Sequence, residues 1–181
     1  MPELKIRMIF ENLADKHQNL IQNKRNEIIE EYGRGFDLIM AALAEIPREA
    51  WAFKPAPDQW SVNEILVHMK DSEANGVLRL HKLIAEAGSN LMTYDPHIWA
   101  SVLDYQNQDV DDALQIFRLL QRTTYRLLKT LSNEAWVRSV VHPEENEPYT
   151  MEMWLDIYTT HVPEHCEQLR EVYRAWKATG H

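Results

Sequence analysis

The segment from Thr150 to about Lys177 constrains the fold most, because its apolar side chains recur at the spacing of one helical face. Two residues on that face are histidines, His161 and His165, four positions apart. Since each residue of an α-helix turns about 100°, both imidazoles lie within the apolar stripe and face the core. The stripe consists of Thr150, Trp154, Tyr158, His161, His165, Leu169, Val172 and Trp176.

This histidine pair has two interpretations. The imidazoles are either core side chains that neighbouring groups satisfy, as is usual for a single buried histidine, or they bind one metal ion from a single helix. Two neutral imidazoles stacked on one buried face are harder to satisfy with protein partners, which favours the metal. Pro163 lies opposite the histidines, so we expect the helix to bend outward there without turning them away.

Amphipathic periodicity predicts further helices along the chain. Ser61 and Glu64 form a capping box, which marks a helix start, and Gly88 follows its end. Gly33 and Gly35 predict a break or a close helix contact in a preceding segment that ends before Pro47. The expected helices comprise residues 3–20, 28–46, 62–87, 109–131 and 150–177, with irregular segments at 89–108 and, as a long loop or irregular hairpin, at 132–149.

Four of these helices are long and amphipathic, which favours an all-α, four-helix-bundle fold. The remaining helix, residues 3–20, is only weakly amphipathic. We therefore expect an N-terminal helical extension in residues 1–22 and the bundle domain in residues 23–181.

Composition narrows the classes of partner. A chain of 181 residues favours one domain with a sizeable core. Its formal charge of −9 argues against nucleic acid or an anionic membrane as the partner, because both bind preferentially to basic protein surfaces. The single cysteine, Cys166, suits a reducing compartment. No apolar run is long enough to span a membrane and the first residues are no signal peptide, so we expect a cytoplasmic location.

A catalytic metal site commonly has three protein ligands and an open position, so a third ligand is needed. His68 lies in the second turn of the helix that begins after Ser61, on the edge of its apolar stripe. It is the best candidate. The other histidines fall near the termini, in expected loops or on another flank of the same helix: His17, His181, His97, His142 and His81.

A polar line follows His68 along the same helix, at successive steps of four, three and four residues: Ser72, Asn75 and Arg79. It either faces solvent, as most such lines do, or lines the approach to the metal, where Arg79 would bind an anionic thiol or a carboxylate. Glu73 falls near the centre of the apolar arc. It is a buried, hydrogen-bonded carboxylate, a sign that the bundle opens there, or an acceptor that orients an imidazole ligand.

The segment Trp60-Ser61-Val62-Asn63-Glu64-Ile65-Leu66-Val67-His68, followed much later by His161-x-x-x-His165, resembles the DinB/YfiT superfamily of metal-dependent proteins. Leu43-x-x-Ile46-Pro47 and His142-Pro143 extend the resemblance, which covers about residues 27–173. It implies a four-helix bundle in which His68, His161 and His165 hold a divalent metal, often zinc or nickel. It also implies a homodimer, and a glutamine after the second histidine of the pair, a place near Gln168. Members with known activity include transferases and isomerases that use bacillithiol, mycothiol or glutathione.

Several functions are compatible with such a site. The leading hypothesis is a thiol-dependent S-transferase acting on a small molecule, in which the metal holds a thiol cosubstrate as its thiolate. A bound water activated in the same way would make the protein a hydrolase. A non-catalytic binding or stress-response protein would instead hold a structural metal, closed by a fourth ligand such as Glu73. The simplest alternative is a metal-free bundle with three satisfied core histidines.

Overall fold

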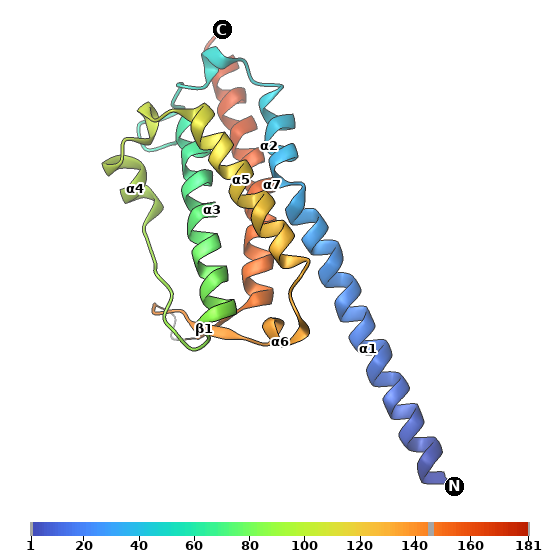
Figure 1. The fold of residues 1–181 in the computed structure, drawn as a ribbon. Coiled ribbons are helices and arrows are strands. Elements are labelled where there is room, and N and C mark those ends of the chain that lie inside the picture. The colour runs from blue at the N-terminus through green and yellow to red at the C-terminus, as the bar shows by residue number, and fades with distance from the viewer. Residues whose placement is uncertain (1, 145–146, 181) are drawn as a thin grey trace.

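The computed structural model describes the backbone of residues 2–144 and 147–180, and the side chains of residue 16 and of residues 18 onward within those ranges. It is a bundle of long helices from which the N-terminal helix projects (Figure 1). Helix α1 spans Pro2–Gly33 without interruption, so the two expected helices on either side of residue 22 form one. Helix α2 follows at Gly35–Leu43. Between residues 18 and 27 only Gln22 and Arg25 are partly covered.

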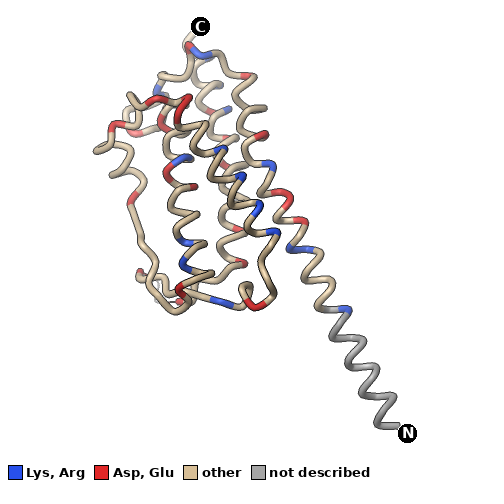
Figure 2. The backbone as a smooth tube through the Cα atoms, viewed as in Figure 1, with Lys and Arg blue, Asp and Glu red and all other residues tan. Residues whose placement is uncertain are grey.

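Helices α3 (Val62–Ala85), α5 (Val110–Leu128) and α7 (Met151–Ala178) complete the bundle with α2 and the end of α1 (Figure 1). Their apolar faces meet in a core that includes Ile65, Phe117 and Leu169 at one end and Leu80 and Trp154 at the other. The outer face of α5 carries a row of exposed arginines, Arg118, Arg122 and Arg126, which is visible as a basic line (Figure 2). The four-helix fold predicted from the periodicity is therefore confirmed.

The break between α1 and α2 falls at the two glycines, as the sequence predicts, and has a packing cause. A Cβ atom on Gly33 would lie 2.7 Å from Cδ2 of Tyr125 on α5. Gly35 lies against the Gln121 side chain, whose Oε1 accepts a hydrogen bond from the backbone N–H of Phe36 at 2.7 Å. Gln121 thus binds one of the free N–H groups at the start of α2, and a side chain at either glycine would have to move Tyr125 or Gln121 of α5.

The segment between α3 and α5 is more regular than expected. It contains the short helix α4 (Pro96–Val102) and the 3-10 turn η2 (Tyr105–Asn107). Asp95 accepts hydrogen bonds from the N–H groups of His97 and Ile98, and Pro96 occupies the first turn. The prediction of an irregular segment was wrong because these capping signals support a helix too short to show periodicity.

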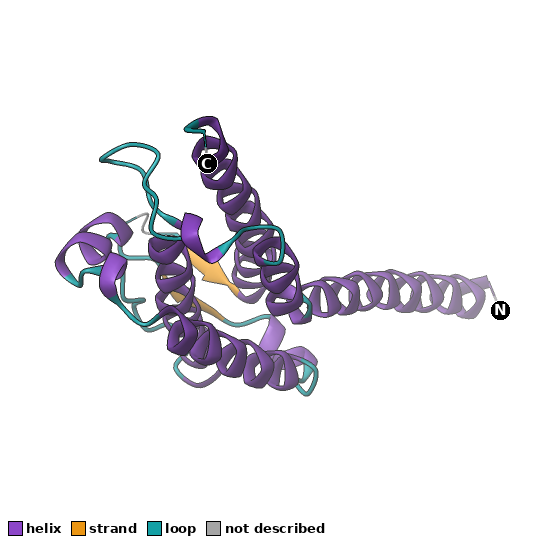
Figure 3. Ribbon diagram, turned by 90° about the horizontal axis from the view of Figure 1, so that it is seen from above, coloured by secondary structure: helices purple, strands orange, loops and turns teal. Residues whose placement is uncertain are grey.

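A small hairpin closes the end of the bundle that is remote from α4 (Figures 1 and 3). Strands β1 (Ser139–Val141) and β2 (Pro148–Thr150) pair antiparallel, after the single-turn helix α6 (Asn133–Trp136). A 3-10 turn, η1 (Arg48–Ala50), begins the connection from α2 to α3. No helix in the described part of the chain combines the length and hydropathy needed to cross a membrane.

Candidate metal centre

Three histidines from two helices meet inside the bundle. His68 comes from the second turn of α3, and His161 and His165 come from the middle of α7. One ring nitrogen of each histidine lies within 4.8 Å of the others. The Nε2 atoms of His161 and His165 are 3.0 Å apart, and the His68 ring centroid lies 5.4 Å from that of His161 and 4.9 Å from that of His165.

Local capping signals fix the residue at which each of these two helices begins. The Ser61 side chain accepts a hydrogen bond from the N–H of Glu64, and the Glu64 carboxylate accepts one from the N–H of Ser61, which begins α3 at a defined residue. Thr150 caps α7 in the same way by accepting from the N–H of Met153. Pro163 is exposed and α7 continues through it, so both histidines stay on the inner side.

The three imidazoles are neutral. Burial, followed by the neighbouring imidazoles, lowers the pKa of His68 to about 3. Burial and His165 likewise lower the pKa of His161 to about 3, and burial lowers the pKa of His165 as well. Each neutral imidazole carries one unprotonated ring nitrogen, and one ring nitrogen of each lies within 4.8 Å of the others. Three imidazoles are the donor set of many zinc sites.

The pattern of hydrogen bonds also fits a metal. His165 Nδ1 donates to Oε1 of Gln168 at 2.7 Å, which leaves the lone pair of the His165 ring on Nε2, the nitrogen that faces His161. His68 is only 6% exposed, and its Nδ1 has no hydrogen-bond partner. The metal-free alternative requires protein groups to satisfy the hydrogen-bonding atoms of all three histidines. His68 Nδ1 does not meet this requirement. The residues present fit a divalent ion.

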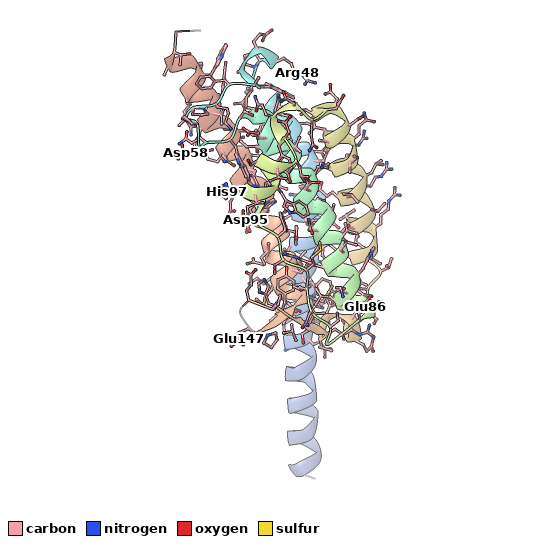
Figure 4. The ribbon with its side chains drawn as sticks, turned by 90° about the vertical axis from the view of Figure 1, so that its left-hand side faces the viewer. Arg48, Asp58, Glu86, Asp95, His97 and Glu147 are labelled. Carbon is pink, nitrogen blue, oxygen red and sulfur yellow. The ribbon has the colours of Figure 1, made fainter. Side chains whose placement is uncertain are left out.

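The cluster opens onto a cleft of about 490 Å³. His68 and His165 form part of its wall, together with the Trp60 indole, whose ring centroid lies 4.8 Å from His68 and 5.1 Å from His97. The cleft is bounded by the connection before α3, the start of α4 and the second half of α7. Figure 4 shows Asp58 and His97, two of its lining residues, on the same side of the bundle. Such an arrangement leaves one side of the cluster open to a small molecule.

The predicted approach residues Ser72, Asn75 and Arg79 do not line this cleft. Ser72 and Asn75 are buried, at 7% and 4% exposed, and Asn75 donates to the backbone carbonyl of Asp71 at 2.8 Å. Arg79 donates to the backbone carbonyl of Met92 at 3.3 Å. Arg79 thus contacts the segment that leads from α3 to α4, whereas Asn75 binds the backbone of its own helix.

Glu73 is buried at 2% exposed, and it accepts a hydrogen bond from the phenol of Tyr32 on α1 rather than from an imidazole. Burial raises the pKa of Glu73 to about 7, against the effect of the Tyr32 hydrogen bond. The group that does orient an imidazole is Gln168. Within the described residues Glu73 is not part of the potential metal-binding cluster, which consists of the three histidines.

Trp60 and His97 are cleft residues to which the sequence analysis gave no role in the site. His97 was set aside as a loop residue, although Asp95 and Pro96 before it are a helix-start signal that places its ring. His81 is exposed on α3 and does not belong to the cluster. His17 and His181 lie outside the described side chains.

Fold and site together define a four-helix bundle with an open three-histidine centre. The chain belongs to the DinB superfamily, whose sequence profile matches residues 31–169 and therefore includes all three histidines. The solved structure of YfiT from Bacillus subtilis, described as having an unusual four-helix bundle topology, superposes with a TM-score of 0.78. That alignment covers 86% of this chain and 89% of YfiT at 21% sequence identity, which supports the fold alone.

Curated relatives carry the name of candidate metal-dependent hydrolases. YfiT of Bacillus subtilis is 27% identical over 115 residues, which cover 64% of this chain and 65% of YfiT. A relative from Bacillus licheniformis is 23% identical over 133 residues, covering 74% of this chain and 76% of that protein. The match to YfiT thus spans slightly less than two thirds of its length.

Proposed function

We propose that this protein is a metal-dependent enzyme acting on a small molecule, with His68, His161 and His165 as the ligands of one divalent ion. The observation that carries the proposal is the meeting of three neutral imidazoles, within 4.8 Å of one another, at the wall of an open cleft. The structural-metal alternative is less well supported, because the described residues offer no fourth ligand that would close the site. Zinc suits three imidazole ligands, and nickel is the second candidate.

The reaction we favour is hydrolysis. A bound divalent ion would supply Lewis acidity, which lowers the pKa of a coordinated water to near neutrality and deprotonates a coordinated thiol. The protein's own side chains orient a ligand and enclose the substrate. Gln168 holds the His165 ring in one orientation, and Trp60 and His97 enclose the substrate beside the cluster. The relatives' names support hydrolysis, and the cleft lacks the arginine that the S-transferase hypothesis assigned to an anionic thiol.

S-transfer from a thiol cosubstrate is the second candidate, since it needs the same three ligands and differs in the nucleophile. A volume of about 490 Å³ leaves room for a small thiol beside a second substrate. A cytoplasmic homodimer remains part of the proposal. Light scattering after gel filtration tests the dimer.

Metal content tests the site directly. Elemental mass spectrometry of the protein, purified without a histidine tag, is expected to find about one metal per chain. His68→Ala and His161→Ala should each lose it. His81→Ala is the matched control, because His81 lies on the same helix as His68 but is exposed and outside the cluster. A wild-type protein that stays metal-free after soaking with zinc and nickel would contradict the proposal.

Activity assays separate the two reactions. The zinc-loaded protein would be tested on a panel of small esters and amides without thiol, and on alkylating electrophiles with bacillithiol or glutathione. Thiol-independent turnover that chelation abolishes supports hydrolysis. Turnover that requires the thiol supports S-transfer, and activity that survives chelation contradicts both.

A further inference from the structure

We propose that the cleft selects substrates that carry a protonated amine on an apolar or aromatic body, with the amine at the rim and the reacting group at the histidines. This inference deepens the proposed function and rests on it. It concerns the charge of the end of the substrate that lies at the mouth of the cleft.

The rim of the cleft carries negative charge without basic side chains. Asp58, in the connection before α3, and Glu171, on α7, both line it, and both are exposed. The lining residues, all of them described, include no lysine or arginine. At the mouth, an amine therefore meets two carboxylates and no basic lining residue. A carboxylate or phosphate at that end of a substrate, remote from the histidines, would be repelled.

Basic residues next to the cleft are engaged elsewhere. Lys54 forms an ion pair with Glu64 at 2.8 Å, and Arg174 pairs with Glu167 at 2.7 Å. Arg174 lies 3.9 Å from Glu171, so it offsets that carboxylate only in part. Asp58 has no ion pair among the described residues, so no basic side chain offsets its carboxylate at the mouth of the cleft.

The surroundings of the cleft reinforce this charge. Between residues 95 and 112, which include α4 on one wall, the chain contains no lysine or arginine, although it contains several aspartates. Figure 2 shows acidic segments gathered in this part of the molecule. Together with the formal charge of −9, they create a field that draws cations toward this end of the bundle.

The inner wall suits an apolar body next to the amine. Trp60, Pro55, Pro96 and Val172 contribute apolar surface, and His68, which is 6% exposed and has an unpartnered Nδ1, lies beyond them. An indole face attracts ammonium ions as well as aromatic rings. The path from rim to histidines thus runs from negative charge, past apolar walls, to the metal ligands.

The test uses three probes that share a metal-binding group and differ in the charge of the far end. They are 4-aminomethyl-, 4-methyl- and 4-carboxy-benzohydroxamic acid, titrated calorimetrically into the zinc-loaded protein at low salt. The amine is expected to bind about tenfold more tightly than the carboxylate, with the neutral probe between them. Because the rim is exposed, the difference should shrink several-fold at about 0.5 M salt.

Variants assign the effect to the rim. Asp58→Asn combined with Glu171→Gln should reduce the amine-to-carboxylate ratio to about twofold and leave the affinity of the neutral probe unchanged. Glu147→Gln is the control, since Glu147 is an exposed carboxylate at the opposite end of the bundle from Asp58 (Figure 4). It should preserve the full ratio.

The outcomes separate the inference from the proposed function. If the neutral probe binds the zinc-loaded protein but all three probes bind equally, or the carboxylate binds best, the inference is overturned and the metal-dependent function stands. A protein that takes up no metal overturns the proposed function and the inference with it.

Discussion

Gln168 accepts a hydrogen bond from Nδ1 of His165 at 2.7 Å, one helical turn along α7. The contact decides which nitrogen of the imidazole carries the proton. Because Nδ1 is the donor, the lone pair lies on Nε2, 3.0 Å from Nε2 of His161. A residue outside the three-histidine cluster therefore leaves the unprotonated nitrogen of His165 facing His161, as the proposed metal site requires.

Replacing Gln168 should weaken metal binding without unfolding the protein. In Gln168→Leu the His165 ring loses the acceptor that fixes its orientation, and zinc affinity is expected to fall about 10- to 100-fold. Competition with a chromophoric chelator measures this change. Gln168→Glu keeps an acceptor at the same place and should retain wild-type affinity or exceed it. Equal losses in both variants would mean that the contact has no orienting role.

The buried pair of Tyr32 and Glu73 should matter for stability. Tyr32→Phe removes the donor and leaves a carboxyl group that is 2% exposed without its phenol partner. The free energy of unfolding at pH 7 is expected to fall by about 1–3 kcal/mol, measured by urea denaturation. Tyr125→Phe provides the comparison. It removes a similar phenol–carboxylate bond to the partly exposed Glu30 and should lower the free energy of unfolding clearly less than Tyr32→Phe does.

The metal-free protein should lose stability on acidification because of its histidines. The pKa of His68 and of His161 is about 3 in the folded state, whereas an unfolded histidine titrates near 6.5. As the pH falls below about 6.5, the unfolded chain binds protons that the folded chain does not, so unfolding becomes easier. Between pH 7 and pH 5, each of these two imidazoles is expected to lower the free energy of unfolding by at most about 2 kcal/mol.

Urea denaturation of the chelated protein at pH 7 and pH 5 measures that loss. Glu73 has the opposite effect on the free energy of unfolding. Its pKa is raised to about 7, so on acidification the folded state binds a proton at a higher pH than the unfolded chain does. The double variant His68→Gln with His161→Gln retains Glu73 and isolates the histidine contribution. It should lose markedly less stability than wild type between the two pH values, and an equal loss would refute the assignment.

The absence of a side chain at Gly76 is expected to keep Tyr158 in its place beside His161. A Cβ atom there would lie 2.5 Å from Cε1 of Tyr158, whose ring centroid is 6.4 Å from that of His161. Gly76→Ala should therefore displace Tyr158, reduce stability by about 1–3 kcal/mol and weaken zinc binding.

Gly88→Ala is the control for that variant. Its Cβ would meet no atom within 4 Å, but the backbone φ of +83° disfavours alanine, at a cost of about 1 kcal/mol. Zinc affinity should stay unchanged in Gly88→Ala. If both variants bind zinc equally well, Tyr158 does not support the centre.

The sequence by itself determined the long helices α3, α5 and α7 and the helix face on which His68, His161 and His165 lie. The capping box at Ser61, the cap at Thr150 and the break at Gly33 and Gly35 depend on contacts within a few residues or on the absence of a side chain. Helical periodicity is equally local, so it placed His161 and His165 on the inner side of α7.

Only the tertiary structure decided which polar groups lie beside the histidines. Periodicity assigns a residue to a face, but it does not say which distant segment covers that face. Ser72, Asn75 and Arg79 do not line the cleft, and Arg79 binds the chain before α4 instead. Trp60, His97 and Asp58 do line the cleft, and they come from connecting segments whose position helical periodicity does not predict. The partner of Glu73 is likewise on α1, 41 residues away, where packing of two helices and not local sequence brings Tyr32 to the carboxylate.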